Sequence, residues 1–370
     1  MHYLDNASTT QVLPSAATAA LAAMCETFGN PSSLHTAGLS AAALVKTARA
    51  QVADALGCAS ERVFFTAGGT EGDNTAIFGA VRKQYHAGKH IITTAVEHPA
   101  VANAVTQLER EGFSVTRVAP HADGRIYTAD VEAALRDDTI LVSVMHVNNE
   151  TGAVMPIKEI SEMLKRRRSR ALFHCDGVQA FMKLPARVES LGVDFYAVSG
   201  HKVHAPKGIG ALYIRQGVRI PPHIVGGGQE SGMRSGTESV PLIAAFGEAI
   251  AQTPKDAGKR IAALRAHLME RLETMPYVRV NYPDSLPCVI SLSLPVKRAE
   301  VAMRILSDRE VYVSNGSACS KGKRSTVLEA CLLPPSVIDG TLRVSLSWTN
   351  TTEDMDALAE GLQAAYERLK

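Results

Sequence analysis

Residues 193–210 read VDFYAVSGHKVHAPKGIG, and Lys202 within this stretch decides how the rest of the chain is interpreted. The apolar run at residues 193–198 predicts a buried parallel strand, followed by a loop that Pro and Gly residues punctuate. A lysine just past a buried strand is poorly solvated, so its ammonium needs a partner charge or loses its proton. A neutral lysine amine is a nucleophile towards aldehydes. A surface lysine whose charged end reaches water is the alternative that this stretch leaves open.

The composition is that of an ordinary globular protein. Its 370 residues provide for two or three domains, or for one large and one small domain. The 39 basic and 37 acidic residues give a formal charge of +2, which argues against a bulk nucleic-acid or membrane binder. The six cysteines form no CxxC pair, so neither a disulfide framework nor a metal site is indicated. The start MHYLDNASTT is unlike a signal peptide and no apolar run has bilayer length, so we expect a cytoplasmic protein.

Short apolar strands alternate with helices from residue 62 onwards, after two alanine-rich helices predicted at residues 14–27 and 37–56. This pattern predicts a mostly parallel sheet with helices on both faces. Polar side chains follow each predicted strand directly, at the edge where ligands bind in such sheets. The strands are expected at residues 62–65, 90–96, 140–147, 171–175 and 193–198.

The residues at two of these strand ends indicate particular ligand groups. The turn Gly68-Gly69-Thr70 precedes a helix predicted from residue 71, so its free backbone N–H groups are suited to a phosphate. It matches neither GxxxxGK[ST] nor GxGxxG, and an ordinary N-cap turn is the alternative. Asp176 closes a buried strand, where a bare carboxylate needs a cationic partner such as a protonated heteroaromatic nitrogen. Capping of the following segment is the alternative for Asp176.

Taken together, these features resemble the fold-type I pyridoxal-phosphate enzymes of aminotransferase class V, and specifically the cysteine desulfurases. The resemblance implies an α/β fold with a large domain at residues 11–250, built on a mostly parallel sheet with helices on both faces. Residues 1–10 and 251–370 would form a smaller α+β domain. The matching stretches are DNASTT, FGNPSS, TAGGTEGDN, EHPAV, MHVNNETG, HCDGVQA, SGHKVHAPKGIGALY, GGGQESGMRSGT, SNGSACSKGKRST and LRVSLSW.

The resemblance also implies how pyridoxal 5'-phosphate is held. Lys202 would bind it covalently and move the proton of the substrate Cα, while Asp176 would keep its ring nitrogen protonated. His98 would stack on the ring, and otherwise it is a helix-start residue before Pro99. Gln179 would donate a hydrogen bond to the phenolic oxygen. The phosphate would be bound by Gly69, Thr70, Ser199, His201 and, from the neighbouring subunit of a homodimer, Thr237, which alone would read as an N-cap.

Two further residues are expected to bind the substrate. Arg343 lies in the apolar strand predicted at residues 342–346, where its guanidinium needs a partner. A substrate carboxylate fits the fork of this side chain, and pairing with a protein acid is the alternative. The resemblance implies that Asn149 shares this carboxylate and assists in the cofactor site, while simple turn chemistry is the alternative.

Cys319 differs in its surroundings from the other cysteines. It lies among small, polar and basic residues, which favour its thiolate, and the resemblance makes it the residue that accepts the substrate sulfur. The loop that follows is shorter and more basic than is usual in the family, which leaves the final sulfur acceptor open. The apolar contexts of three other cysteines predict inert buried side chains, and these are Cys175, Cys288 and Cys331.

The resemblance implies conversion of L-cysteine to L-alanine, with the sulfur held on Cys319 as a persulfide. An acceptor protein would then receive it for iron–sulfur cluster assembly or tRNA thiolation, without direct nucleic-acid or membrane binding. A selenocysteine lyase, another class V lyase or an aminotransferase would share nearly every cofactor contact. A non-catalytic regulator that kept the fold is a more remote alternative.

Overall fold

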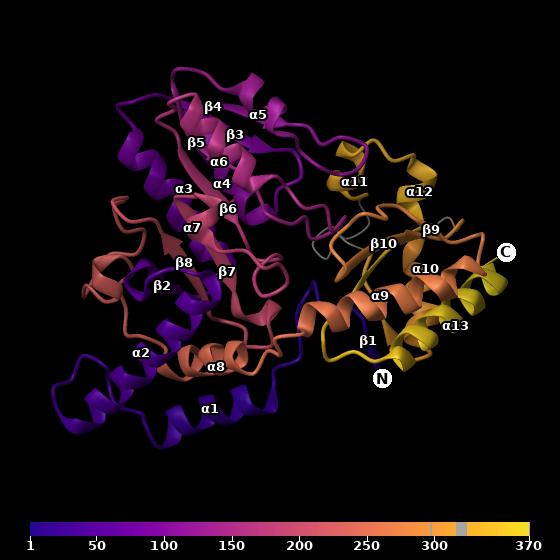
Figure 1. Ribbon diagram of the computed structural model, residues 1–370, viewed down its shortest axis with the longest axis horizontal. Coiled ribbons are helices and arrows are strands. Elements are labelled where there is room, and N and C mark those ends of the chain that lie inside the picture. The colour runs from indigo at the N-terminus through magenta and orange to yellow at the C-terminus, as the bar shows by residue number, and fades with distance from the viewer. Residues whose placement is uncertain (297, 316–323, 370) are drawn as a thin grey trace.

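A seven-stranded sheet forms the centre of the larger part of the protein (Figure 1). The computed structural model describes residues 1–296, 298–315 and 324–369. The strand order is β2-β8-β7-β6-β5-β3-β4, and every pairing is parallel except the two made by β8. The prediction of a mostly parallel sheet is confirmed, although β4 and β8 were not predicted. The strands are β2 (Val63–Thr66), β3 (His90–Thr94), β4 (Ser114–Val118), β5 (Thr139–Ser143), β6 (Leu172–Asp176), β7 (Phe195–Ser199) and β8 (Gly210–Ile214).

Successive residues of each strand point to opposite sides, so the sheet presents buried side chains on both faces. Helices cover both of these faces. On one face, Ile91, Leu141 and Leu172 pack with α3 (Gly69–Gln84) and α4 (Pro99–Arg110). On the other face, the neighbouring strand residues Ile92, Val142 and Phe173 belong to a core that includes α6 (Ile157–Arg166) and α8 (Val240–Ala251). The central strands are therefore buried on both faces, as the sequence pattern indicated.

Two helices near the N terminus pack on α8 at the periphery of the large sheet (Figure 1). They are α1 (Pro14–Cys25) and α2 (Thr36–Leu56), close to the predicted bounds. The packing of α2 on α8 is tight, because a Cβ on Gly247 would lie 2.8 Å from the Cα of Ala48. Small alanine side chains allow this close approach.

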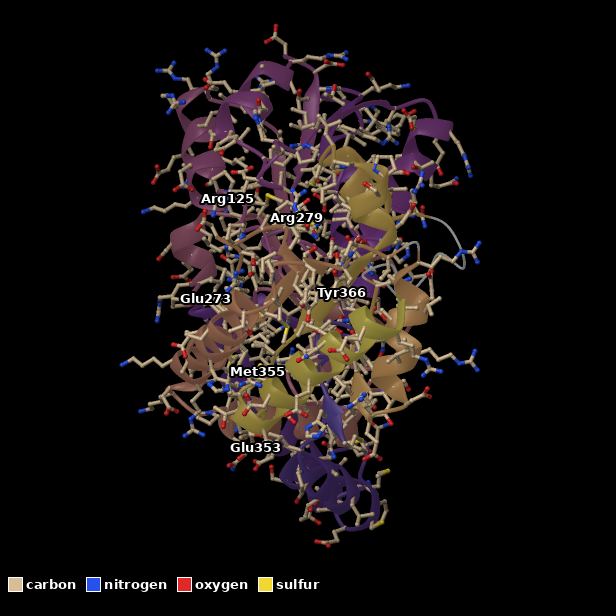
Figure 2. All side chains as sticks on the ribbon, turned by 90° about the vertical axis from the view of Figure 1, so that its right-hand side faces the viewer. Arg125, Glu273, Arg279, Glu353, Met355 and Tyr366 are labelled. Atoms are coloured by element: carbon tan, nitrogen blue, oxygen red, sulfur yellow. The ribbon has the colours of Figure 1, made fainter. Side chains whose placement is uncertain are left out.

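A second hydrophobic core lies beside the first and is built on the antiparallel sheet β12-β10-β9 and the parallel pair β1-β11. Figure 2 shows α9 and α13 side by side across this part, with the Met355 label on α13. The predicted domain boundary near residue 250 stays a prediction. The elements here are β1 (His2–Tyr3), α9 (Ala257–Glu273), β9 (Arg279–Val280), β10 (Val289–Ser293), α10 (Ala299–Ser307), β11 (Val311–Tyr312), β12 (Thr341–Ser345) and α13 (Thr352–Leu369).

The first ten residues connect the two cores. β1 pairs with β11 in the smaller part, and the backbone N–H of Ser345 donates to the carbonyl oxygen of Leu4 at 2.7 Å. Farther along, the backbone N–H of Thr10 donates to the carbonyl oxygen of His201, beside β7 of the large sheet. Within the described residues, none of the helices has both the length and the apolar character of a membrane span. The remaining elements are η1 (Ser60–Arg62), α5 (Thr128–Ala134), α7 (Val188–Leu191), η2 (Gly200–Lys202), η3 (Glu230–Gly232), α11 (Thr326–Ala330) and α12 (Pro335–Asp339).

Candidate functional site

The carboxyl ends of five strands lie at one edge of the large sheet (Figure 1). β3, β5, β6 and β7 are parallel, and β2 shares their direction because β8 is antiparallel to both β2 and β7. The polar residues predicted to follow these strands therefore lie at the edge where ligands bind in sheets of this type.

Lys202 directly follows β7 as the last residue of η2, and its side chain is only partly exposed. Its Nζ donates hydrogen bonds to the carbonyl oxygens of Ala7 at 2.7 Å and Ser8 at 2.6 Å. Burial, followed by the positive charges of Lys183 and Arg343, lowers the pKa of Lys202 to about 7. About half of the amine is therefore neutral at pH 7, which is what a nucleophile towards an aldehyde requires.

This lowered pKa predicts how the reactivity of Lys202 depends on pH in the protein without cofactor. Because only the neutral amine reacts, reductive methylation of Lys202 is expected to reach half its maximal rate at about pH 7. Below this midpoint the rate is expected to fall about tenfold per pH unit, since the charged form then dominates. Peptide mass spectrometry measures the label. A midpoint above roughly pH 9 would contradict the burial argument.

Asp176 is the last residue of β6 and is almost fully buried. Its Oδ1 accepts a hydrogen bond from the backbone N–H of Val178 at 2.9 Å, so it does cap the following segment. Burial raises the pKa of Asp176, whereas the charge of His98, the Val178 N–H and the charge of Lys202 oppose this rise. A cationic group beside Asp176 would stabilise its ionised form, and a protonated ring nitrogen is such a group.

His98 is the N-cap residue of α4, which is the structural alternative considered for it. Its Nδ1 accepts a hydrogen bond from the backbone N–H of Ala100 at 3.2 Å. Burial lowers the pKa of His98, and the charge of Lys202 acts in the same direction while that of Asp176 opposes it. Burial thus favours the neutral ring, and its position near Asp176 and Lys202 suits the stacking role.

Three further buried groups next to Asp176 were not singled out from the sequence. The carboxyl of Asp73 lies 3.3 Å from Nε2 of His174, whose Nδ1 is 2.8 Å from the hydroxyl of Ser143. Burial raises the pKa of Glu97 to about 8, raises that of Asp73, and lowers that of His174 to about 3. Glu97 and His174 are thus mainly uncharged at pH 7, and burial favours the uncharged form of Asp73. The available signal was that His174 lies two residues before Asp176, on the same face of β6.

The start of α3 lies against the ends of β6 and β7. The helix begins at Gly69, two residues earlier than predicted, and no side chain among the described residues caps it. A Cβ on Gly69 would lie 2.6 Å from Cγ2 of Val178, and one on Gly68 would lie 3.8 Å from the hydroxyl of Ser199. A side chain at position 69 would require the Val178 side chain to move, and the exposed Thr70 adds a hydroxyl in the first helical turn. The first backbone N–H groups and the dipole of this helix are suited to a phosphate, and binding of a phosphate here stays a prediction.

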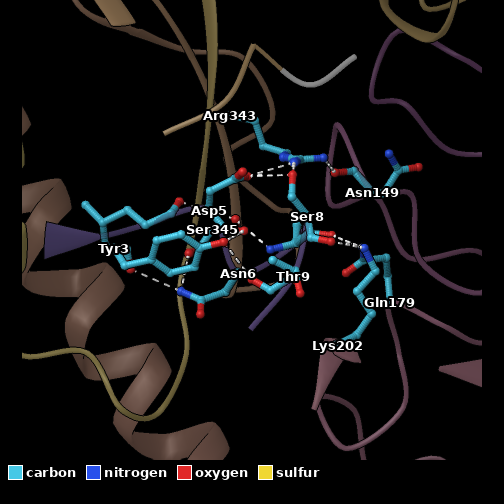
Figure 3. Close-up of polar contacts among 12 residues, drawn as sticks. Tyr3, Asp5, Asn6, Ser8, Thr9, Asn149, Gln179, Lys202, Arg343 and Ser345 are labelled. Atoms are coloured by element: carbon cyan, nitrogen blue, oxygen red, sulfur yellow. Dashed lines mark hydrogen bonds and ion pairs between the residues drawn. The ribbon is translucent and has the colours of Figure 1, made fainter. Parts of the chain in front are cut away.

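The N-terminal segment DNASTT (residues 5–10) crosses the site, which the sequence analysis did not predict (Figure 3). The carbonyl oxygen of Ala7 accepts from Nζ of Lys202 and also from Nε2 of Gln179 at 2.9 Å. Nδ1 of His201 lies 3.2 Å from the hydroxyl of Thr9, and burial lowers the pKa of His201 to about 4. The neutral His201 ring and the amide of Gln179 are thus both fixed by this segment.

Arg343 lies in β12 with its guanidinium turned to the N-terminal segment (Figure 3). Nη2 donates to Oδ1 of Asp5 at 2.9 Å and to the hydroxyl of Ser8 at 2.6 Å. Nη1 donates to the backbone carbonyl oxygen of Asn149 at 3.0 Å. Arg343 therefore pairs with a protein acid, which is one of the two alternatives given above. Its contact with Asn149 is with the backbone and not with the side-chain amide. Recognition of a substrate carboxylate by Arg343 and Asn149 stays a prediction.

The remaining predicted residues lie apart from this cluster or outside the described residues. Thr237 is exposed, three residues before α8. Cys319 falls within residues 316–323 and is outside the described residues, so its role stays a prediction. The predicted burial of three other cysteines is confirmed, and these are Cys175, Cys288 and Cys331.

The groups at this edge fit pyridoxal phosphate as a set. Lys202 offers a partly neutral amine for the aldehyde, and the glycine-restricted start of α3 offers N–H groups for the phosphate. The buried carboxyl of Asp176 needs a positive partner, which the protonated pyridine nitrogen provides. These three requirements match three separate parts of one cofactor.

Comparison with known proteins agrees with this chemistry. The sequence profile of the aminotransferase class-V family matches residues 2–358. The chain is 43% identical to cysteine desulfurase 2 of Trichormus variabilis over 375 residues, covering all of this chain and 94% of that protein. It is 39% identical to the cysteine desulfurase IscS of Methanosarcina thermophila, again over the whole chain and 92% of that protein.

Solved structures show the same relationship. A NifS-like protein superposes with a TM-score of 0.91 at 34% identity, covering 99% of this chain and 98% of its own. A structure described as SspA in complex with cysteine gives a TM-score of 0.85 at 34% identity, covering 95% of this chain and all of the other. The chain belongs to the aminotransferase class-V family of fold-type I, pyridoxal-phosphate-dependent enzymes. Within that family, the two relatives named above, which it matches over its full length, are cysteine desulfurases.

Proposed function

We propose that this protein is a pyridoxal-phosphate-dependent cysteine desulfurase that converts L-cysteine to L-alanine and holds the released sulfur on Cys319. The observation that supports this most strongly is the Lys202 amine, which has a pKa of about 7 at the carboxyl edge of the sheet. The full-length similarity to cysteine desulfurases supports the choice of substrate.

In this proposal each contact found at the sheet edge has a part in holding the cofactor. Lys202 would hold the aldehyde carbon, Asp176 the ring nitrogen, and His98 one ring face. Gln179 would donate to the phenolic oxygen. When bound, pyridoxal phosphate supplies a ring that withdraws electrons from the substrate Cα. The phosphate would be held by the start of α3 together with Gly69, Thr70, Ser199, His201 and Thr237 of a second copy.

Lys202 also handles the proton of the substrate. Its neutral amine would accept the proton from the substrate Cα and return one later. The carbonyl oxygens of Ala7 and Ser8 are placed to hold the resulting ammonium, at 2.7 and 2.6 Å from Nζ. A pKa near 7 suits both directions of this transfer at neutral pH.

Cys319 completes the reaction. Its thiolate attacks the substrate sulfur, so that an S–S bond forms while the bond between the sulfur and Cβ breaks. The electron pair of the broken bond stays with the substrate, and protonation there gives alanine. The product on the enzyme is a persulfide, which we propose is passed to an acceptor protein of iron–sulfur cluster assembly or tRNA thiolation. The cytoplasmic location expected from the sequence stays a prediction.

Arg343 is proposed to bind the substrate carboxylate, and an Arg343→Ala variant tests this. Loss of a bidentate charge-assisted pair is expected to raise KM for L-cysteine by about tenfold to a hundredfold, because such bonds contribute about 1.5–3 kcal/mol. Steady-state kinetics measure KM, and cofactor absorbance serves as the control for an intact site. An Arg343→Ala variant with an unchanged KM would refute the role.

We propose a homodimer, because the surface around α1 and α2 is unusually apolar for a region exposed to water. Thr237 lies just before α8, which packs on these two helices, and we propose that it reaches the phosphate site of a second copy bound at this surface. Sedimentation of a monomer at micromolar concentration would contradict the proposal. The exposed apolar side chains are Leu21, Met24, Phe28, Leu34 and Leu39, which are 54% to 92% exposed.

Product analysis tests the function as a whole. The purified holoenzyme is incubated with L-cysteine, and alanine, sulfide and protein persulfide are measured. Equimolar alanine and transferred sulfur are the expected result. Accumulation of a keto acid would instead identify an aminotransferase. Turnover of selenocysteine but not of cysteine would identify a selenocysteine lyase.

A further inference from the structure

A second amine, that of Lys183, lies beside Lys202 and has no part in the chemistry described so far. Lys183 follows β6 in a turn, four residues after Gln179, and its side chain is partly buried. Its Nζ donates a hydrogen bond to Oε1 of Gln179 at 2.8 Å. Lys183 and Lys202 also line one small cavity of about 30 Å³, together with Asn6, Thr10 and His204 among others.

The contact with Lys183 fixes which way the Gln179 amide points. A lysine ammonium can only donate a hydrogen bond, so the Gln179 atom that it contacts is the oxygen. The carbonyl oxygen of Ala7 can only accept, so the atom facing it at 2.9 Å is the amide nitrogen. The NH₂ group therefore lies on the Lys202 side of Gln179, with a second hydrogen left to donate.

The charge of Lys183 acts on Lys202 directly. Among the charged groups that influence Lys202, Lys183 has the largest effect, and it makes protonation of the Lys202 amine less favourable. Burial lowers the pKa of Lys183 itself, although the nearby Cys288 opposes this. The other ionisable groups facing Lys202 come from separate elements, and these are Asp5, His98, Asp176, His201 and Arg343.

We propose that Lys183 is a positioning residue of the cofactor site, whose ammonium orients the Gln179 amide and repels positive charge on the Lys202 amine across the small cavity that both side chains line. The inference rests on the proposed cofactor site, yet its main consequence concerns the protein without cofactor. The Lys183 side chain thus has two coupled effects, because the same ammonium contacts Gln179 and repels the proton on Lys202.

The test compares three cofactor-free proteins: wild type, Lys183→Met and Lys183→Arg. The methionine variant keeps an unbranched apolar stem but removes the charge and the donor, whereas the arginine variant keeps both. Reductive methylation of Lys202 is measured against pH by peptide mass spectrometry. The midpoint is expected to rise by about one pH unit in Lys183→Met and to stay within about 0.3 unit of wild type in Lys183→Arg. An unchanged midpoint in a folded Lys183→Met protein overturns the electrostatic part.

Titration with pyridoxal phosphate tests the orienting part. The dissociation constant is expected to increase about tenfold in Lys183→Met and to recover in Lys183→Arg. Equal affinity in wild type and Lys183→Met overturns it. If the methionine variant does not fold, Lys183→Gln replaces it. This variant removes the charge but keeps an N–H donor for Gln179, so the methylation midpoint is still expected to rise by about one pH unit while the dissociation constant stays near that of wild type. Because the methylation assay uses neither cofactor nor cysteine, it can succeed where desulfuration fails, so the two proposals are tested separately.

Discussion

A Lys202→Ala variant is expected to form alanine from L-cysteine at least about a thousand times more slowly than the wild type. The substitution removes the group that binds the cofactor covalently and the base that takes the Cα proton. The visible absorbance of the bound cofactor at the lysine-linked wavelength is expected to disappear with it. Alanine is measured by chromatography, and absorbance spectra are recorded on the same protein samples.

The matched control for this variant is Lys207→Ala. Lys207 lies on the same loop as Lys202, but its side chain is exposed. It is expected to keep wild-type absorbance and turnover, which separates loss of the Lys202 amine from damage to the loop. Wild-type turnover in Lys202→Ala would show that the reaction does not depend on this amine.

A Cys319→Ser variant is expected to form no persulfide and to lose at least about a hundredfold in alanine formation. A serine hydroxyl is a poor nucleophile towards sulfur. Residue 319 is not among the proposed cofactor contacts, so the cofactor absorbance is expected to persist. Persulfide is measured by alkylation and mass spectrometry after incubation with L-cysteine.

Cys25→Ser supplies the comparison for this variant, because Cys25 is an exposed cysteine at the end of α1. Its replacement is expected to change neither persulfide nor alanine formation. Sulfide release at the wild-type rate in Cys319→Ser, or a persulfide on Cys25 in the wild type, would rule out the role given to Cys319.

Much of the large sheet could be predicted from the sequence, because its central strands are apolar runs ending in polar residues. β4 was missed because it is a half-exposed strand at the sheet border, with alternating rather than continuous apolar character. β8 was missed because it directly follows a Pro- and Gly-rich loop that was read as continuing to Gly210. Nothing in local periodicity shows that β8 runs against its neighbours.

The candidate site could be predicted only in part. Lys202 and Asp176 were found because each follows a buried strand, and strand ends are visible in the sequence. The contacts of Lys202 with Ala7 and Ser8 were not found from the sequence, because they join segments far apart in the chain. For the same reason the sequence could not decide between a substrate and a protein acid as the partner of Arg343, which the structure pairs with Asp5.

The central claim is that pyridoxal phosphate is bound covalently by Lys202 at the carboxyl edge of the large sheet. The most direct measurement is reduction of the holoenzyme with borohydride, followed by digestion and peptide mass spectrometry. The account predicts one modified peptide, with the added mass of the reduced cofactor on Lys202. Modification of a different lysine, such as Lys183, with Lys202 left free would contradict it.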